Sequence, residues 1–192
     1  MRRNVAVLVA VPLAVVLSAC GDVPLAPAGD AGAVLGPAYH LSAREVRMLD
    51  VCDPASFNAA IGPGTCTNRN GGLTFDKFIA QLQRHGTVES WRFMPEVIHV
   101  PRTMTLDVAN IGGETHTFTE VAAFGGGFVP FLNQLTGNLV PALECVNPID
   151  PMLPNPALVF VPAGGHDHIT FQPGVAKKYM CCIHPWMRAV SR

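Results

Sequence analysis

The last strand-forming stretch of the chain leads into a loop in which three side chains could bind a soft metal ion. The run Tyr179–Met187 reads YMCCIHPWM and offers a thiolate at Cys181, an imidazole at His184 and a thioether at Met187. A thiolate and two imidazoles in a trigonal arrangement, with a weak axial methionine, form the ligand set of a blue copper site. The loop supplies every member of this set except one histidine.

A second histidine that is remote in the sequence would complete the ligand set. His116 lies in the segment Gly112–Phe118, directly after a predicted strand. Because a β-sandwich brings the ends of separate strands together, an upstream ligand is expected to be distant along the chain. Two alternatives are that Cys182 replaces Cys181 as the ligand, or that both sulfurs bind the metal. Only one residue separates Cys182 from His184, which disfavours the first of them.

Short strands separated by turns dominate the C-terminal half and predict a β-sandwich. A further segment, Thr74 to Leu82, has the spacing of an amphipathic helix that begins after Thr74 and ends at Gly86. Residues 41–50 are compatible with either a short helix or a strand. The expected strands, with a turn at 172–174, are Val97–Val100, Thr103–Asn110, Ala157–Val161, His168–Phe171 and Lys178–Cys181.

The motif Cys-x-x-His-x-x-Met after the last strand, with one histidine far upstream, resembles the cupredoxins. Its short spacing is most similar to that of amicyanin and pseudoazurin. The resemblance covers about residues 91–192. It implies a mainly β fold, a cupredoxin-like Greek-key β-sandwich, here preceded by a short helical extension. It also implies one mononuclear Cu(I)/Cu(II) ion bound by His116, Cys181, His184 and Met187.

The chain departs from that family in two places. Thr117 stands where most small cupredoxins have an asparagine that braces the thiolate loop. The stretch 121–156 is longer than its counterpart in a minimal cupredoxin, and it could cap the site or offer a docking surface. In cupredoxins the histidine of the loop reaches the surface through an apolar patch. The resemblance therefore implies His184 as the electron exit, with Trp186 and Phe128 as candidates for the patch. The alternative for Trp186 is a plain position in the hydrophobic core.

The six cysteines of the chain are compatible with two disulfides. Once the copper thiolate and the lipidation candidate at Cys20 are set aside, three pairings are possible among Cys52, Cys66, Cys145 and Cys182. We prefer Cys52 with Cys66, which are close in sequence, and Cys145 with Cys182. Because successive strand residues point to opposite faces, Cys182 is expected to face away from the metal and toward the 121–156 insertion.

The first twenty residues have the pattern of an export signal. Two arginines precede an apolar run from Val5 to Leu17 that is short for a membrane span. The sequence LSAC that ends at Cys20 then resembles the lipobox of bacterial lipoproteins. This resemblance implies acylation of Cys20 and a lipoprotein anchored to a membrane of the cell envelope, exposed to the periplasm. The alternative is an ordinary signal peptide in which Cys20 has no role.

These features predict four parts along the chain. They are a signal peptide with a lipobox (1–20), a flexible tether (21–40), an extension with a short helix and a disulfide (41–90), and a cupredoxin domain (91–192). The Ala-, Pro- and Gly-rich composition of 21–40 is typical of a linker.

The expected function is one-electron transfer between redox partner proteins of the cell envelope, and we expect a carrier rather than an enzyme. Cupredoxin oxidases and reductases have several domains and further histidine clusters. The alternative is a copper-binding or copper-delivery protein without a redox role. The adjacent cysteines disfavour a dinuclear copper centre, which needs three residues between them, and a methionine ligand disfavours zinc.

Two further kinds of site receive little support from the sequence. His166 and His168 would share one face of a strand and form a weak candidate for a second metal pair. The net charge of −1 gives no reason to expect nucleic acid as a partner, because that would call for a basic face.

Overall fold

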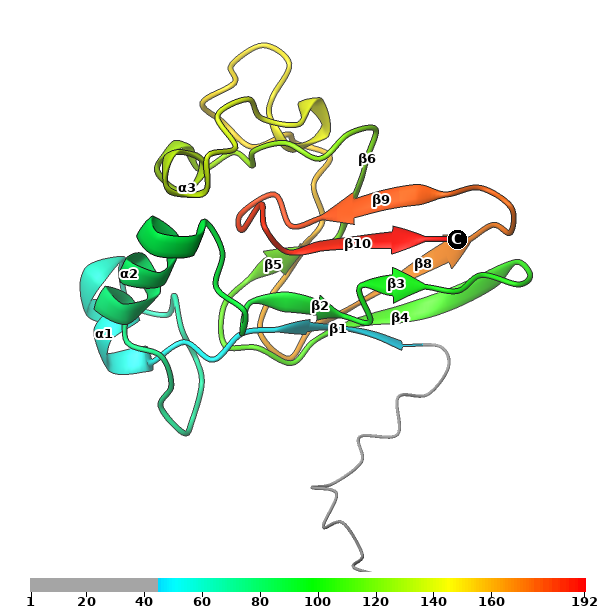
Figure 1. Cartoon of the computed structure of the whole chain (residues 1–192). Coiled ribbons are helices and arrows are strands. Elements are labelled where there is room, and N and C mark those ends of the chain that lie inside the picture. The colour runs from blue at the N-terminus through cyan, green and yellow to red at the C-terminus, as the bar shows by residue number, and fades with distance from the viewer. Residues whose placement is uncertain (1–44) are drawn as a thin grey trace, which may run out of the picture. The chain divides into compact units, whose positions relative to one another are not determined.

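A computed structural model of the chain describes residues 45–192, and the predicted signal peptide, Cys20 and tether lie outside this range. Most of the described elements are short strands (Figure 1). The helices are α1 (Pro54–Ala60), α2 (Phe75–His85), α3 (Pro130–Thr136) and the 3-10 helix η1 (Leu143–Cys145). The strands are β1 (Glu45–Leu49), β2 (Arg92–Met94), β3 (Val97–Ile98), β4 (Met104–Asn110), β5 (His116–Thr117), β6 (Thr119–Val121), β7 (Phe160–Val161), β8 (His166–Phe171), β9 (Lys177–Met180) and β10 (Arg188–Ser191).

The strands form two four-stranded sheets, in the orders β2-β1-β4-β8 and β3-β10-β9-β6, and β5 pairs separately with β7. The pairs β1/β4 and β3/β10 are parallel and the others are antiparallel. Buried aromatic rings join the two sheets, since Phe171 of β8 lies 5.2 Å from Tyr179 of β9 between ring centroids. The prediction of a mainly β sandwich with short helices near its start is confirmed.

The sequence of residues 41–50 is compatible with a helix or a strand, and in the structure Glu45–Leu49 form the strand β1. Val46 and Met48 are buried and alternate with partly exposed neighbours, which is the burial pattern of a strand with one face on the core. β1 lies between β2 and β4 in its sheet. Residues 45–49 are therefore part of the sandwich itself and do not stand outside it.

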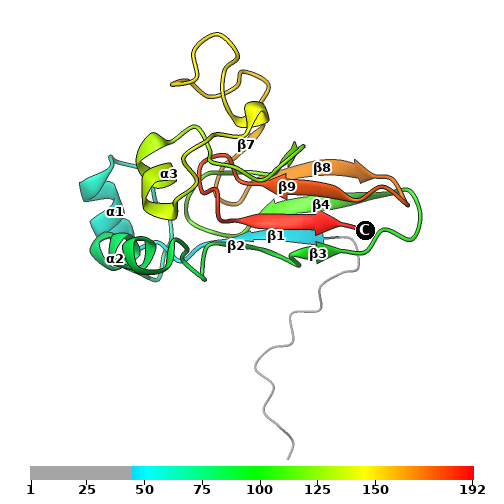
Figure 2. The ribbon, with the colours of Figure 1, turned by 45° about the horizontal axis from the view of Figure 1, so that its top comes forward.

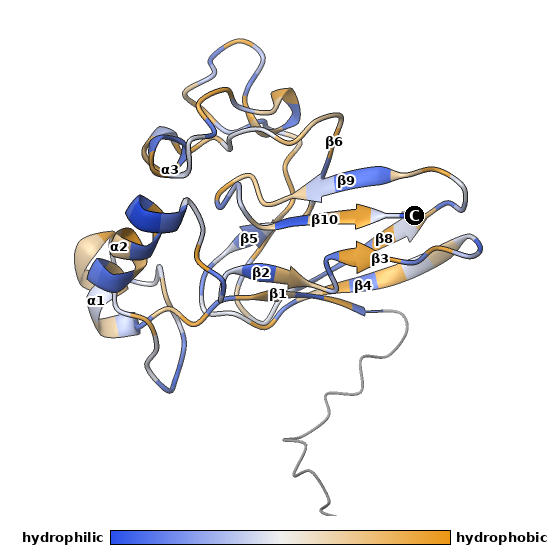
Figure 3. Ribbon diagram, viewed as in Figure 1, coloured by the Kyte–Doolittle hydropathy of each residue, from blue (hydrophilic) through white to orange (hydrophobic). Residues whose placement is uncertain are grey.

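The predicted helix at Thr74–Leu82 is confirmed as α2, which continues to His85. Thr74 is its N-cap residue, and Gly86 ends it in the left-handed conformation at φ 68°. That conformation favours glycine, because a side chain there meets the backbone. Hydrophilic residues gather at the C-terminal end of α2 (Figure 3), while Phe78 and Leu82 are buried on its inner face.

The three α-helices gather at the end of the sandwich where β9 turns into β10 (Figures 1 and 2). Phe57 of α1 and Phe78 of α2 both pack on the buried Trp91, with ring centroids 5.8 and 4.9 Å away. This cluster fixes the helical extension to the sandwich. Within the described part of the chain, no helix has both the length and the apolar character needed to cross a membrane.

Two disulfides link loops around the same end of the sandwich. Cys52 bonds Cys66, and Cys145 bonds Cys182, which are the pairings preferred from the sequence. The second disulfide lies in a small core of its own with Val121, where the insertion packs against the residues that follow β9. The 121–156 insertion is thus covalently fixed beside the loop that carries the candidate ligands.

Replacing Cys145 and Cys182 together by alanine should reduce the free energy of unfolding by about 2–4 kcal/mol, because the open loop gains entropy in the unfolded chain. Urea denaturation of the variant and of the wild type under the same non-reducing conditions measures the difference. Equal midpoints would show that the insertion is held without this bond.

Candidate metal centre

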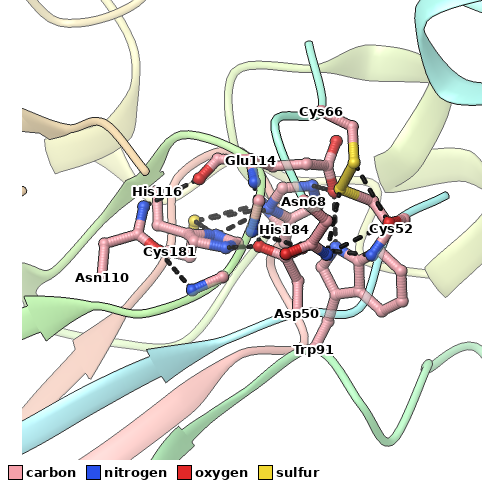
Figure 4. Close-up of polar contacts among 12 residues, drawn as sticks. Asp50, Cys52, Cys66, Asn68, Trp91, Asn110, Glu114, His116, Cys181 and His184 are labelled. Atoms are coloured by element: carbon pink, nitrogen blue, oxygen red, sulfur yellow. Dashed lines mark hydrogen bonds and ion pairs between the residues drawn. A yellow bond between two sulfur atoms is a disulfide. The ribbon is translucent and has the colours of Figure 1, made fainter. Parts of the chain in front are cut away.

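Side chains from two separate parts of the chain converge at this end of the sandwich. His116 lies on β5, whereas Cys181 follows β9 and His184 lies in the loop before β10. Their ligand atoms all lie within 4.8 Å of one another, and all three residues are buried. Figure 4 shows the sulfur of Cys181 facing both imidazoles.

The separations between the three ligand atoms match those expected around a shared ion. Imidazole nitrogen and thiolate sulfur bind a first-row metal ion at about 2.0 and about 2.3 Å, so a trigonal set has about 3.5 Å between nitrogens and about 3.7 Å between nitrogen and sulfur. The two Nδ1 atoms of His116 and His184 are 3.2 Å apart. The Cys181 Sγ atom lies 3.8 Å from Nδ1 of His116 and 3.7 Å from Nδ1 of His184. The residues present therefore suit a trigonal thiolate-imidazole metal site.

The other two candidate ligands on the loop, Met187 and Cys182, have different structural roles. Met187 is fully buried and closes the loop, since its N–H donates to the carbonyl of His184 at 2.9 Å and its carbonyl accepts from the N–H of Cys181 at 3.1 Å. Cys182 forms the disulfide with Cys145. The alternatives in which Cys182 binds metal are therefore wrong, and Cys181 is the free cysteine among the described residues.

Thr117 braces the thiolate loop in two ways. Its backbone N–H donates to the Cys181 sulfur at 3.4 Å, and its hydroxyl accepts the N–H of Cys182 at 2.8 Å. The N–H of His184 also points to the sulfur, at 3.5 Å. A threonine hydroxyl thus makes the local hydrogen bond at the position where most small cupredoxins have an asparagine side chain.

A buried asparagine holds the turn that leads to His116. The Nδ2 group of Asn110, at the end of β4, donates to the carbonyl of Glu114 at 2.7 Å and to that of Val161 at 2.8 Å. Val161 of β7 is also the strand partner of His116. The asparagine therefore fixes three segments relative to one another next to the first candidate ligand.

Asp50 lies directly behind His116. Its Oδ2 atom is 2.8 Å from Nε2 of the imidazole, and both side chains are fully buried. The carboxylate also accepts backbone N–H groups of Cys52, Gly113 and Glu114, at 3.2, 2.9 and 3.0 Å. A Cβ atom on Gly113 would lie 2.6 Å from the Cys52 sulfur, so glycine is needed for this close approach. A carboxylate on the outer nitrogen of a ligating histidine fixes its tautomer and orientation.

In the absence of metal, the charged forms of Asp50, His116 and Cys181 stabilise one another. Burial disfavours charge, but the hydrogen bond and charge of His116, with backbone amides, hold the pKa of Asp50 at about 2. Burial likewise opposes protonation of His116, yet its contacts with Asp50 and Cys181 raise its pKa to about 9. Burial raises the pKa of the Cys181 thiol, and the two histidines outweigh it and bring that pKa well below 9.0. Carboxylate, imidazolium and thiolate thus alternate in sign.

A second buried carboxylate lies beside the other imidazole. Glu114 Oε2 is 3.6 Å from Nε2 of His184 and accepts the indole N–H of Trp91 at 2.6 Å. Burial is the main cause that raises the pKa of Glu114, and the nearby charge of Asp50 acts in the same direction. Each candidate histidine ligand therefore has a carboxylate near its outer nitrogen.

The expectation that His184 reaches the surface through an apolar patch is wrong for this chain. His184 exposes only 3% of its surface. The Trp186 ring packs 5.3 Å from the His184 ring and 5.9 Å from Phe78 of α2. Phe128 belongs to the separate small core around the second disulfide. Side chains of the helices in the extension and the insertion line the hollow beside the imidazole.

Sequence reasoning missed Asp50, Glu114 and Trp91 as parts of the centre. A signal was present for the first of them, because Val46, Met48 and Asp50 follow one another at the two-residue period of a strand's core-facing side. A carboxylate in that series has to be paired when it is buried. His166 and His168 are exposed on β8 beside Asp107 and do not join the centre.

Comparisons with known proteins give a remote likeness. No protein-family model matches the chain, and no curated protein matches it. Among solved structures, the chain is similar to a novel purple cupredoxin from Nitrosopumilus maritimus, with 11% sequence identity and a TM-score of 0.38. The match covers 77% of this chain and 96% of that one. A likeness this remote transfers no residue role to the present chain.

Asp50→Asn should weaken copper binding about 10–100-fold, because the amide cannot stabilise His116 as the carboxylate does. Competition with a chelator of known affinity measures the change. Asp107→Asn is the matched control, since Asp107 is a half-exposed carboxylate that contacts His166 outside the centre. Equal affinity in the two variants would contradict the role of Asp50.

The metal-free protein should keep Cys181 as a thiolate at pH values well below 9.0, the ordinary pKa of the thiol. The ultraviolet absorption of the thiolate, followed as the pH is lowered from 10, should persist well below pH 9. His116→Ala should move the transition to higher pH, because burial of the sulfur remains while a cationic partner is lost. Cys181→Ser provides the baseline, and a wild-type transition at or above pH 9 would refute the charge arrangement.

Proposed function

We propose that this chain is a type 1 (blue) copper protein that passes single electrons between redox partners in the bacterial cell envelope. The observation that carries the proposal is the convergence of His116, Cys181 and His184, whose separations suit one trigonal ion. Met187 is the proposed axial ligand, because it closes the same loop and is fully buried. A copper ion bound by these residues would supply a one-electron couple between Cu(I) and Cu(II).

Rigidity of the ligand set supports electron transfer over copper delivery. Two of the proposed ligands are held by hydrogen bonds: His116 by Asp50, and the Cys181 sulfur by two backbone N–H groups. Ligands that cannot move keep the reorganisation that accompanies each electron transfer small. The burial of all three residues would slow release of the ion. A delivery protein has to release its ion, so this burial favours electron transfer.

The copper-loaded protein should show an intense thiolate-to-copper charge-transfer band in the visible range, as expected for this ligand set. Cys181→Ser should abolish the band, because it removes the sulfur. The matched control is the double variant Cys145→Ser with Cys182→Ser, which should keep it. If the band disappears when the protein is reduced and returns when it is reoxidised, the result would support an electron carrier. A colourless protein that binds copper and loses it readily to a chelator would instead favour the delivery function.

The position in the cell envelope is proposed from the lipobox pattern that ends at Cys20. Cys20→Ser should move the protein from the membrane fraction to the soluble periplasmic fraction, because it removes the acylated residue. Fractionation of cells followed by immunoblotting measures this change. Membrane association that is unchanged in the variant would refute acylation at Cys20.

A further inference from the structure

An apolar hollow of about 320 Å³ leads to His184 from the side of the helices. Its walls are side chains of α1, α2 and α3, among them Phe57, Phe75 and Phe131. Among its lining residues only Thr65, Glu114 and His184 are polar. The volume is at the lower end of the range for small-molecule sites and suits a molecule with one aromatic ring.

Glu114 and His184 form the floor of the hollow. One oxygen of the Glu114 carboxylate accepts no hydrogen bond from a described residue. Glu114 exposes 6% of its surface, and its Oε2 atom is occupied by the Trp91 indole. Its other oxygen makes no hydrogen bond with any described residue, whereas Figure 4 shows Glu114 beside Trp91 and His184. This oxygen is not among the fully buried atoms that lack a partner, so it keeps contact with solvent, and an occupant of the hollow that brings a donor could pair with it.

The depth of the floor excludes a flat partner surface. Because His184 exposes 3% and Glu114 6% of their surfaces, a protein laid across the mouth of the hollow would not touch either residue. An occupant must be small enough to enter. A hydroxyl group suits this end of the hollow, because its O–H can donate to the Glu114 oxygen that has no donor.

We infer that this hollow is a binding site for a small phenol, with its ring against the phenylalanine side chains and its hydroxyl on Glu114. The ring of the bound phenol would then lie beside His184, next to the proposed copper centre. Binding itself depends only on residues of the chain and needs no copper. The inference goes beyond the proposed function and can fail or hold independently of it.

The test is calorimetric titration of the metal-free full chain with three probes of nearly equal shape: 4-methylphenol, 4-methylanisole and toluene. 4-Methylphenol should bind saturably, and the other two at least about tenfold more weakly, because each lacks the O–H donor. In parallel, the indole N–H resonance of Trp91 should shift with 4-methylphenol, since it shares the Glu114 carboxylate.

Two tryptophan substitutions at exposed apolar positions locate the site. Ile61→Trp places a larger side chain among the lining residues and should weaken 4-methylphenol binding at least about tenfold. Val175→Trp changes a residue of similar exposure outside the hollow and should leave binding unchanged. Absence of saturable binding, equal binding of the three probes, or an unaffected Ile61→Trp variant would each overturn the inference.

Discussion

The contact between the Cys181 sulfur and two imidazoles, shut away from water, is the constraint on which the rest of the structure depends. A thiolate in such a place is costly unless positive charge and N–H groups face it. His116 and two backbone amides supply these groups, and Asp50 keeps the imidazole cationic. The glycine at 112 can be understood as a requirement of that carboxylate, because a Cβ atom there would meet the Asp50 side chain.

The helices change what the centre can contact. Side chains of α1, α2 and α3 line the apolar hollow that leads to His184. Trp91 joins this cover to the centre, since its ring packs on Phe57 and its N–H reaches Glu114. The extension and the insertion thus control access to His184, whereas β5 and the loop between β9 and β10 carry the candidate ligands.

The sequence predicts the ligand loop because three donors fall within seven residues, and it predicts the disulfide pairs by proximity and by the alternation of faces. It also predicts α2 from its spacing and its terminal glycine. It does not predict Glu114, because a single buried carboxylate has no spacing pattern. For Asp50 the two-residue period of the strand gives the buried face, but the partners of the carboxylate come from other segments and have no local signal. The cover over His184 was missed for a similar reason: burial of one imidazole depends on how three short helices pack, and no local signal reports that.

The neighbouring cysteines at the end of β9 have a consequence for how the protein matures. Cys145 can be oxidised with either of two adjacent thiols, but only the bond to Cys182 leaves a sulfur for the metal. A bridge to Cys181 would consume the sulfur that the proposed metal site needs. Correct oxidation therefore has to be achieved before the ion enters, or be directed by an ion that already occupies the thiol of Cys181.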